Sequence, residues 1–281
     1  LSFFTFKGIS YVADVSRRRE AGSRSFFDVL FYLSFFPQIM SGPLERFEAF
    51  RQQLSVRDRS AVRTARGLRR FALGLAKKLI LSGEAGLVAN AAFSAGEALD
   101  ARIAWLGALA YCLQLYFDFS GYSDMAVGLG EALGFHSPEN FRYPYAAVSI
   151  SDFWRRWHMS LSFWFRDYLY IPLGGSRKGK WRTAGNKFIV FALCGVWHGA
   201  GLTFLLWGAW HGLLAALESL RVLNVERWRK TAPGRVLSRV YLLLAVCLGF
   251  VMFRAESAKA GFDMLSAMFT GFSFTAEGNL L

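Results

Sequence analysis

Residues 187–218 constrain the fold more than any other stretch, because this run is apolar through its middle and basic on both flanks. His198 lies inside the run, directly before Gly199-Ala200-Gly201. An ionisable side chain among so many apolar residues is unfavourable to place in a bilayer, so it marks a functional site by default. Basic flanks are typical of cytoplasmic loops, which predicts that the segment enters a membrane and returns.

The length of this run selects between two shapes. As a helix it measures about 48 Å, too short for two full crossings of a ~30 Å hydrocarbon core. We expect a re-entrant hairpin that breaks at the two glycines, with His198 about 16 Å along its first arm and near mid-membrane. One long tilted helix is the alternative.

Apolar runs recur along the whole chain of 281 residues, which is 54% hydrophobic and 17% aromatic. We expect clear spans at residues 103–119 and 236–253 and a short apolar run at residues 26–40. Residues 71–93 form either two short helices or one helix with snorkelling lysines. These runs predict an all-α, polytopic membrane protein.

The net charge of +13 and the pI of about 10.0 raise the question of nucleic acid as a partner. The basic residues instead cluster at the ends of apolar runs, at residues 17–19, 77–78, 177–182 and 227–230. That placement follows the positive-inside rule, so we expect no nucleic acid among the partners.

The three cysteines, Cys112, Cys194 and Cys247, show no spacing typical of a disulfide framework or a metal site. We therefore predict no bound metal. Cys194 and His198 share a helix face, which leaves open a Cys–His nucleophile beside the interpretation of Cys194 as a packing residue.

A second Trp-His pair, Trp157-His158, lies in an arginine-rich segment. We expect one helix here, capped by Ser151 and lying at a membrane interface. Its aromatic face would carry His158 together with Trp154, Leu161 and Phe165, and a separate face would carry Arg155, Met159, Ser162 and Arg166.

Two acids, Asp118 and Asp124, lie in apolar company at and just beyond the end of the expected span at residues 103–119. They either support a site or only satisfy helix ends or pair with an arginine. His211 falls on a different helix face from His198, so we interpret it as structural, and His136 as an ordinary loop residue.

The residue types exclude several chemistries, because the chain has no Walker loop, no dinucleotide-binding glycine turn and no Gly-x-Ser-x-Gly elbow. A neutral imidazole in an apolar site can remove the proton of an alcohol that attacks an activated acyl group. Arg155, Arg156 and Arg166 could hold a phosphorylated acyl donor at the cytoplasmic mouth. Simple topology and headgroup contact are the alternative role for these arginines.

Four phrases in order resemble the signatures of a known family. They are Phe117-Asp118-Phe119-Ser120-Gly121-Tyr122-Ser123-Asp124-Met125-Ala126, Phe153-Trp154-Arg155-Arg156-Trp157-His158-Met159-Ser160-Leu161-Ser162, Arg166-Asp167-Tyr168-Leu169-Tyr170-Ile171-Pro172-Leu173-Gly174-Gly175 and Val196-Trp197-His198-Gly199-Ala200-Gly201. They look like those of the membrane-bound O-acyltransferases (MBOATs), in the bacterial branch that serves alginate O-acetylation and teichoic-acid D-alanylation.

The resemblance implies a helical bundle around a funnel through the bacterial cytoplasmic (inner) membrane, with re-entrant segments. It implies that His198 is the essential residue, that His158 is a second important position, and that Trp197, Asp118 and Asp124 support them. Residues 1–281 would form one domain, and the family normally has further helices before residue 1 and more chain after residue 253.

The same resemblance implies transfer of an acyl group, in the first place acetyl, from acetyl-CoA or an acyl carrier protein to an extracytoplasmic polysaccharide such as alginate. No permanent cofactor is expected. The partners would be the donor, the polysaccharide, a periplasmic acetyltransferase and membrane lipids. A transporter or flippase of an acylated or polysaccharide precursor, or a membrane scaffold, are the alternatives.

Overall fold

The computed structural model describes residues 3–17, 22, 25–57 and 60–272, and every regular element within them is helical. This confirms the all-α prediction. The elements, with η marking π- and 3₁₀-helical segments, are α1 (Phe3–Ser16), α2 (Phe26–Ser34), α3 (Phe47–Ser55), α4 (Ala61–Ala76), η1 (Lys77–Leu81), α5 (Ser82–Phe93), η2 (Gly96–Ala98), α6 (Ala101–Ala132), η3 (Pro144–Ala146), α7 (Ile150–Trp154), α8 (Met159–Phe165), η4 (Arg166–Tyr170), α9 (Gly179–His198), α10 (Leu202–Ser219), α11 (Val225–Trp228), α12 (Ala232–Arg254) and α13 (Ala258–Thr270).

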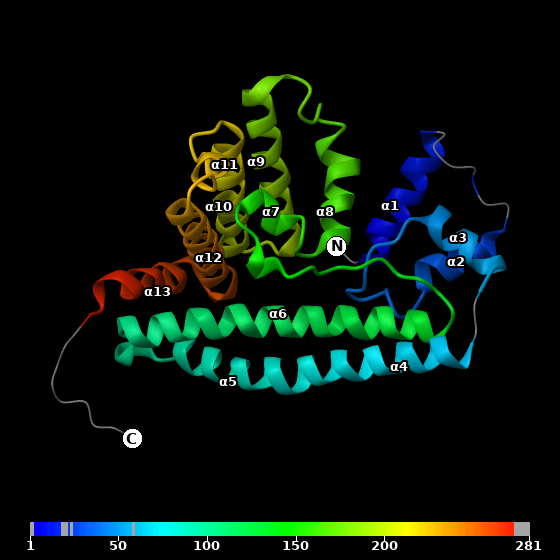
Figure 1. Ribbon diagram of the computed structural model, residues 1–281, viewed down its shortest axis with the longest axis horizontal. Coiled ribbons are helices and arrows are strands. Elements are labelled where there is room, and N and C mark those ends of the chain that lie inside the picture. The colour runs from blue at the N-terminus through cyan, green and yellow to red at the C-terminus, as the bar shows by residue number, and fades with distance from the viewer. Residues whose placement is uncertain (1–2, 18–21, 23–24, 58–59, 273–281) are drawn as a thin grey trace.

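Two long helical rods form the base of the molecule. The 32-residue helix α6 packs along the rod formed by α4, η1 and α5. Figure 1 shows α8, α9, α10 and α12 standing across this base, with α1, α2 and α3 grouped near the C-terminal end of α6. The main apolar core joins α6, α7, α8, α10 and α12, and a smaller one brings Tyr32, Phe35, Phe47 and Phe50 onto Phe135.

The rod of α4 and α5 answers the question left open for residues 71–93. It is one continuous helix that widens into a π-helical turn at Lys77–Leu81. Such turns insert an extra residue and often occur at functional sites. Here both lysines are half-buried and form ion pairs with α6: Lys77 pairs with Asp124 at 2.6 Å, and Lys78 pairs with Asp118.

A tight helical hairpin is formed by α9 and α10, which break at the expected Gly199-Ala200-Gly201. The single long helix is therefore wrong. Two glycines allow the arms to touch: a Cβ atom on Gly195 would lie 2.4 Å from the carbonyl oxygen of Phe204, and one on Gly208 2.5 Å from that of Phe191.

The hairpin is longer than the sequence suggested. Helix α9 begins at Gly179 rather than near residue 187, so the arms have 20 and 18 residues, or about 30 and 27 Å. The basic residues before residue 187 continue the helix, so the hairpin extends beyond the run at residues 187–218 from which the re-entrant shape was predicted. That the hairpin is re-entrant stays a prediction. His198 is the last residue of the first arm, directly before the expected break.

Among the described residues, α12 is the one helix long and apolar enough to cross a membrane by length and composition. It contains the span expected at residues 236–253. The span expected at residues 103–119 lies in α6, which falls short of this apolarity because small residues, tyrosines and acids interrupt it.

Candidate active site

His158 occupies a break between two short helices, where the sequence predicted one continuous helix. Helix α7 is capped by the side chain of Ser149, which accepts from the Asp152 amide, and not by Ser151. It ends at Trp154, and His158 has the left-handed backbone angles φ 45° and ψ 53°. The expected shared face of Trp154, His158, Leu161 and Phe165 therefore does not exist.

The break has a tertiary cause. The Arg142 amide donates to the Arg156 carbonyl at 2.9 Å, and the Met159 amide donates to the Asn140 carbonyl at 2.9 Å. These bonds from the loop after α6 replace helical hydrogen bonds around His158. A non-glycine residue in the left-handed region is uncommon and is often found at functional sites.

The His158 side chain is only 3% exposed. Its Nδ1 lies 3.1 Å from Oδ1 of Asn140, and its Nε2 is buried with no hydrogen-bond partner in the part of the chain that the structure describes. The ring of Phe3 stacks on the imidazole at 5.8 Å between centroids, and Phe119 meets it edge-on at 4.6 Å.

His198, by contrast, is the last residue of α9 and is half-buried among aromatic rings. The centroids of Trp197, Trp207 and Phe253 lie 4.6, 5.1 and 5.1 Å from its own. Phe204 stacks on it at 6.4 Å.

The fold brings the two Trp-His pairs together through one ring. Phe3 contacts His158 and also lies 5.6 Å from the Trp197 ring. The two segments that the sequence singled out therefore lie next to each other in the fold, on either side of Phe3.

A cavity of about 310 Å³ reaches His158. Arg155, Arg166 and Lys187 line it, together with aromatic and aliphatic side chains and Cys194. The structure thus places two of the three predicted donor-binding arginines beside His158. Lys187 was not singled out as a site residue, since the sequence showed it only as the basic flank of an apolar run.

A second, more polar cavity of about 630 Å³ adjoins the first and shares Ser151, Arg155 and Lys187 with it. Its other charged side chains are Asp152, Arg156, Glu218, Arg221, Glu226, Arg229 and Arg239. Arg156 lines only this second cavity, where it pairs with Asp152 at 3.0 Å. A cationic mouth that leads into an apolar passage can hold an anionic head and admit an uncharged arm.

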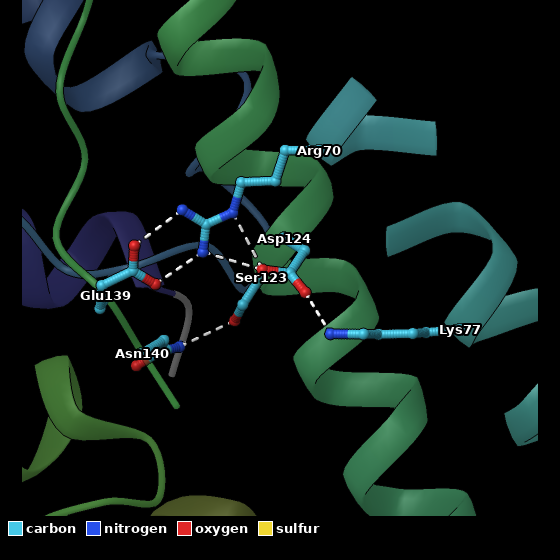
Figure 2. A network of polar contacts seen from close by, with 6 residues as sticks. All are labelled: Arg70, Lys77, Ser123, Asp124, Glu139 and Asn140. Atoms are coloured by element: carbon cyan, nitrogen blue, oxygen red, sulfur yellow. Dashed lines mark hydrogen bonds and ion pairs between the residues drawn. The ribbon is translucent and has the colours of Figure 1, made fainter. Parts of the chain in front are cut away.

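The two predicted supporting acids lie in ion pairs between helices. Asp124 binds Arg70 at 2.8 Å and Lys77 at 2.6 Å, and Figure 2 shows these contacts. Arg70 also binds Glu139, and hydrogen bonds to Glu139 and then Asp124 raise the pKa of its guanidinium above the usual value despite partial burial. The sequence offered pairing with an arginine as the alternative to a role in a site. The structure contains such a pair for Asp124, and a pair with a lysine for Asp118.

His211 and Trp197 pack among aromatic rings. Buried His211 meets the rings of Trp154 and Trp207 at 5.2 and 5.3 Å. Trp197 packs on Phe6 as well as on Phe3 and His198. Within the described ranges no three His, Cys, Asp or Glu side chains are grouped to hold a metal ion.

Comparison with known proteins matches residues 2–257 to the model of the membrane-bound O-acyltransferase family, MBOAT. A probable alginate O-acetylase AlgI of Pseudomonas fluorescens is 44% identical over 96% of this chain and 54% of its own length. A peptidoglycan O-acetyltransferase of Helicobacter pylori is 34% identical over 95% of this chain and 56% of its own. A teichoic acid D-alanyltransferase of Bacillus subtilis is 32% identical over 91% of this chain and 68% of its own length. The chain spans about half the length of the alginate relatives.

Proposed function

Since this chain belongs to the membrane-bound O-acyltransferase family, we propose that it transfers an acetyl group from a cytoplasmic thioester to a polysaccharide hydroxyl. Alginate is the acceptor we propose first, because relatives with alginate O-acetylase in their names are up to 44% identical to this chain. The relatives named above are all acyl-transferring enzymes, which leaves the transporter or flippase alternative without support.

The observation that carries this proposal is the pair of adjoining cavities that ends at His158. Phosphate groups of acetyl-CoA, or of an acyl carrier protein's prosthetic arm, would bind the arginines of the polar cavity, because guanidinium pairs well with phosphate. The uncharged arm would then enter the narrower cavity past Arg155 and Arg166 and bring its thioester to His158.

We assign His198 the role of general base. It would take the proton of the acceptor hydroxyl as that oxygen attacks the thioester carbonyl, and pass it to the departing thiolate as the C–S bond breaks. The aromatic rings around His198 lower the polarity of its surroundings and favour a neutral imidazole that can accept the proton. His158 would orient the donor or polarise its carbonyl.

The setting that we propose is the cytoplasmic (inner) membrane, crossed several times. A periplasmic acetyltransferase would receive the acetyl group or act with this protein on the polysaccharide. His198 would act either on the final acceptor or on a carrier of the acetyl group.

Membrane vesicles that contain the full chain, its periplasmic partner and alginate test this function directly. With acetyl-labelled coenzyme A or labelled acyl carrier protein outside inverted vesicles, we expect label on the polysaccharide inside. A variant with both histidines replaced by alanine should give none above background. Equal labelling by the wild type and the double variant would overturn the proposal.

A further inference from the structure

The side chain of Asn140 connects His158 to α6, and no sequence motif drew attention to it. It is 1% exposed in the loop that follows α6. Its Oδ1 lies 3.2 Å from the Ser160 amide, 3.0 Å from the Ser160 hydroxyl and 3.1 Å from Nδ1 of His158. Its Nδ2 donates to the Ser123 hydroxyl at 3.0 Å, a contact drawn in Figure 2.

These neighbours determine which way the amide points. A backbone N–H can only donate, so the atom of Asn140 that faces the Ser160 amide must be its oxygen. Nδ1 of His158 faces that same oxygen, so it must carry a proton to make the hydrogen bond. A neutral imidazole has only one N–H group, which leaves Nε2 with a free lone pair.

We propose that Asn140 is a positioning residue that holds His158 as the Nδ1–H tautomer and keeps Nε2 available as an acceptor beside the donor cavity. The inference rests on the proposed function for its chemical meaning. It also decides between two roles of His158, because polarising a carbonyl requires an N–H group, and the only one is already bound to Asn140. The remaining role is to accept a hydrogen bond or a proton from the donor or acceptor.

An ion-pair network holds the loop on which Asn140 lies. Its neighbour Glu139 binds Arg70 at 2.7 and 2.6 Å, and Arg70 in turn binds Asp124, which is next to Ser123 on α6 (Figure 2). The bonds from Arg142 and Asn140 to the turn at His158 complete the attachment. Asp124 thus acts on His158 only indirectly, because its ion pair with Arg70 holds the loop of Asn140 against α6.

The first test reads the tautomer and does not depend on acyl transfer. The full chain, labelled with ¹⁵N-histidine in lipid nanodiscs, is compared with His158→Gln to assign the His158 signals. We expect one neutral form of His158, protonated at Nδ1, and a mixture or the Nε2–H form in Asn140→Leu. An Nε2–H form in the wild type, or no change in Asn140→Leu, would overturn the proposal.

Asn186→Leu is the matched control. Asn186 is equally buried, and its amide donates to the backbone carbonyls of Leu173 and Gly175 rather than to a histidine. Its removal should lower stability and leave the His158 signals as in the wild type. A tautomer change of the same size in this control would show that loss of any buried amide suffices, which contradicts a specific role for Asn140.

The second test uses kinetics in the vesicle assay. Asn140→Leu should lower kcat by up to roughly tenfold and leave the KM for the donor within about twofold, since a wrong tautomer affects chemistry rather than binding. Asn140→Asp keeps the acceptor oxygen and should restore much of the rate. Its carboxylate favours the imidazolium, so the acidic limb of the pH–rate profile should move to higher pH.

The two tests separate this inference from the proposed function, and Asn140→Asp keeps them usable if Asn140→Leu does not fold. A correct tautomer in a protein that transfers no acyl group would support the role of Asn140 and contradict the proposed function. An acidic limb that does not move in Asn140→Asp, in an active enzyme, would overturn the role of Asn140 alone.

Discussion

The surroundings of the two histidines differ in kind. His158 is fixed by a hydrogen bond from Nδ1 to Asn140 and by a left-handed backbone, whereas His198 is surrounded by four aromatic rings at the end of a helix. A hydrogen bond determines which nitrogen carries the proton, but ring packing determines only the plane of the imidazole. His198 therefore suits a base that gains and loses a proton, and His158 suits an acceptor of fixed direction.

Among these changes, replacement of His198 by alanine is expected to lower the rate of acyl transfer most. A general base contributes about 100- to 10,000-fold in rate, so His198→Ala should lose nearly all acyl transfer in reconstituted vesicles and still insert as a folded protein. His136→Ala changes an exposed loop histidine and serves as control. Normal turnover in His198→Ala would contradict the mechanism.

A smaller loss is expected for His158→Ala. One hydrogen bond to the reacting groups is worth about 1.4 kcal/mol, or roughly tenfold in rate, so the variant should keep measurable activity. Initial rates of both histidine variants at saturating donor give the ratio. Equal losses would remove the division between a proton-transferring and a fixed histidine.

The arginines sharpen the comparison further, because Arg155 and Arg156 line the polar cavity that we propose for the phosphates, whereas Arg166 lines the cavity that reaches His158. Arg155→Gln combined with Arg156→Gln should raise the KM for the donor roughly tenfold, the effect of losing charge-assisted hydrogen bonds, with a smaller change in kcat. Arg166→Gln should do less, since Arg166 lies beside the passage proposed for the uncharged arm and pairs with Asp167.

Arg102→Gln is the control for these variants, because its exposed guanidinium pairs with Asp100 at the far end of α6. If the rate depends on donor concentration in the same way in all four proteins, the arginines serve topology and headgroup contact and do not bind the donor.

The smallest effect on activity is expected from single-cysteine variants that test the topology of the hairpin formed by α9 and α10. Single cysteines at Lys178 and Lys230, in a background without the three natural cysteines, should both react with an impermeant maleimide from the cytoplasmic side. Surface changes of this kind should alter the rate by less than about twofold. Labelling from opposite sides would show that α9 and α10 do not return the chain.

Much of this could be predicted from residue patterns alone. The helical class, the span at residues 236–253 and the break at Gly199-Ala200-Gly201 each depend on local apolar patterns or on glycine. The start of α9 could not be found this way, because its first turns are polar and basic and resemble a loop.

The surroundings of His158 were predicted least well, for a clear physical reason. Residues 150–165 have a helical pattern, but backbone bonds from Asn140 and Arg142 compete with that helix and break it. Such a contact joins separate segments of the chain, so a local sequence pattern does not reveal it.

The prediction that residues 17–19 form a basic cluster on the cytoplasmic side is not tested, since residues 18 and 19 lie outside the described residues.

The glycine contacts between α9 and α10 have a consequence for how this site can evolve. No residue is smaller than glycine, so every substitution at Gly195 or Gly208 adds volume between two backbones already in contact. Mutation can force these arms apart but can never bring them closer. Substitution at these two positions can therefore change the separation of α9 and α10 in one direction only, and with it the position of His198 at the end of α9.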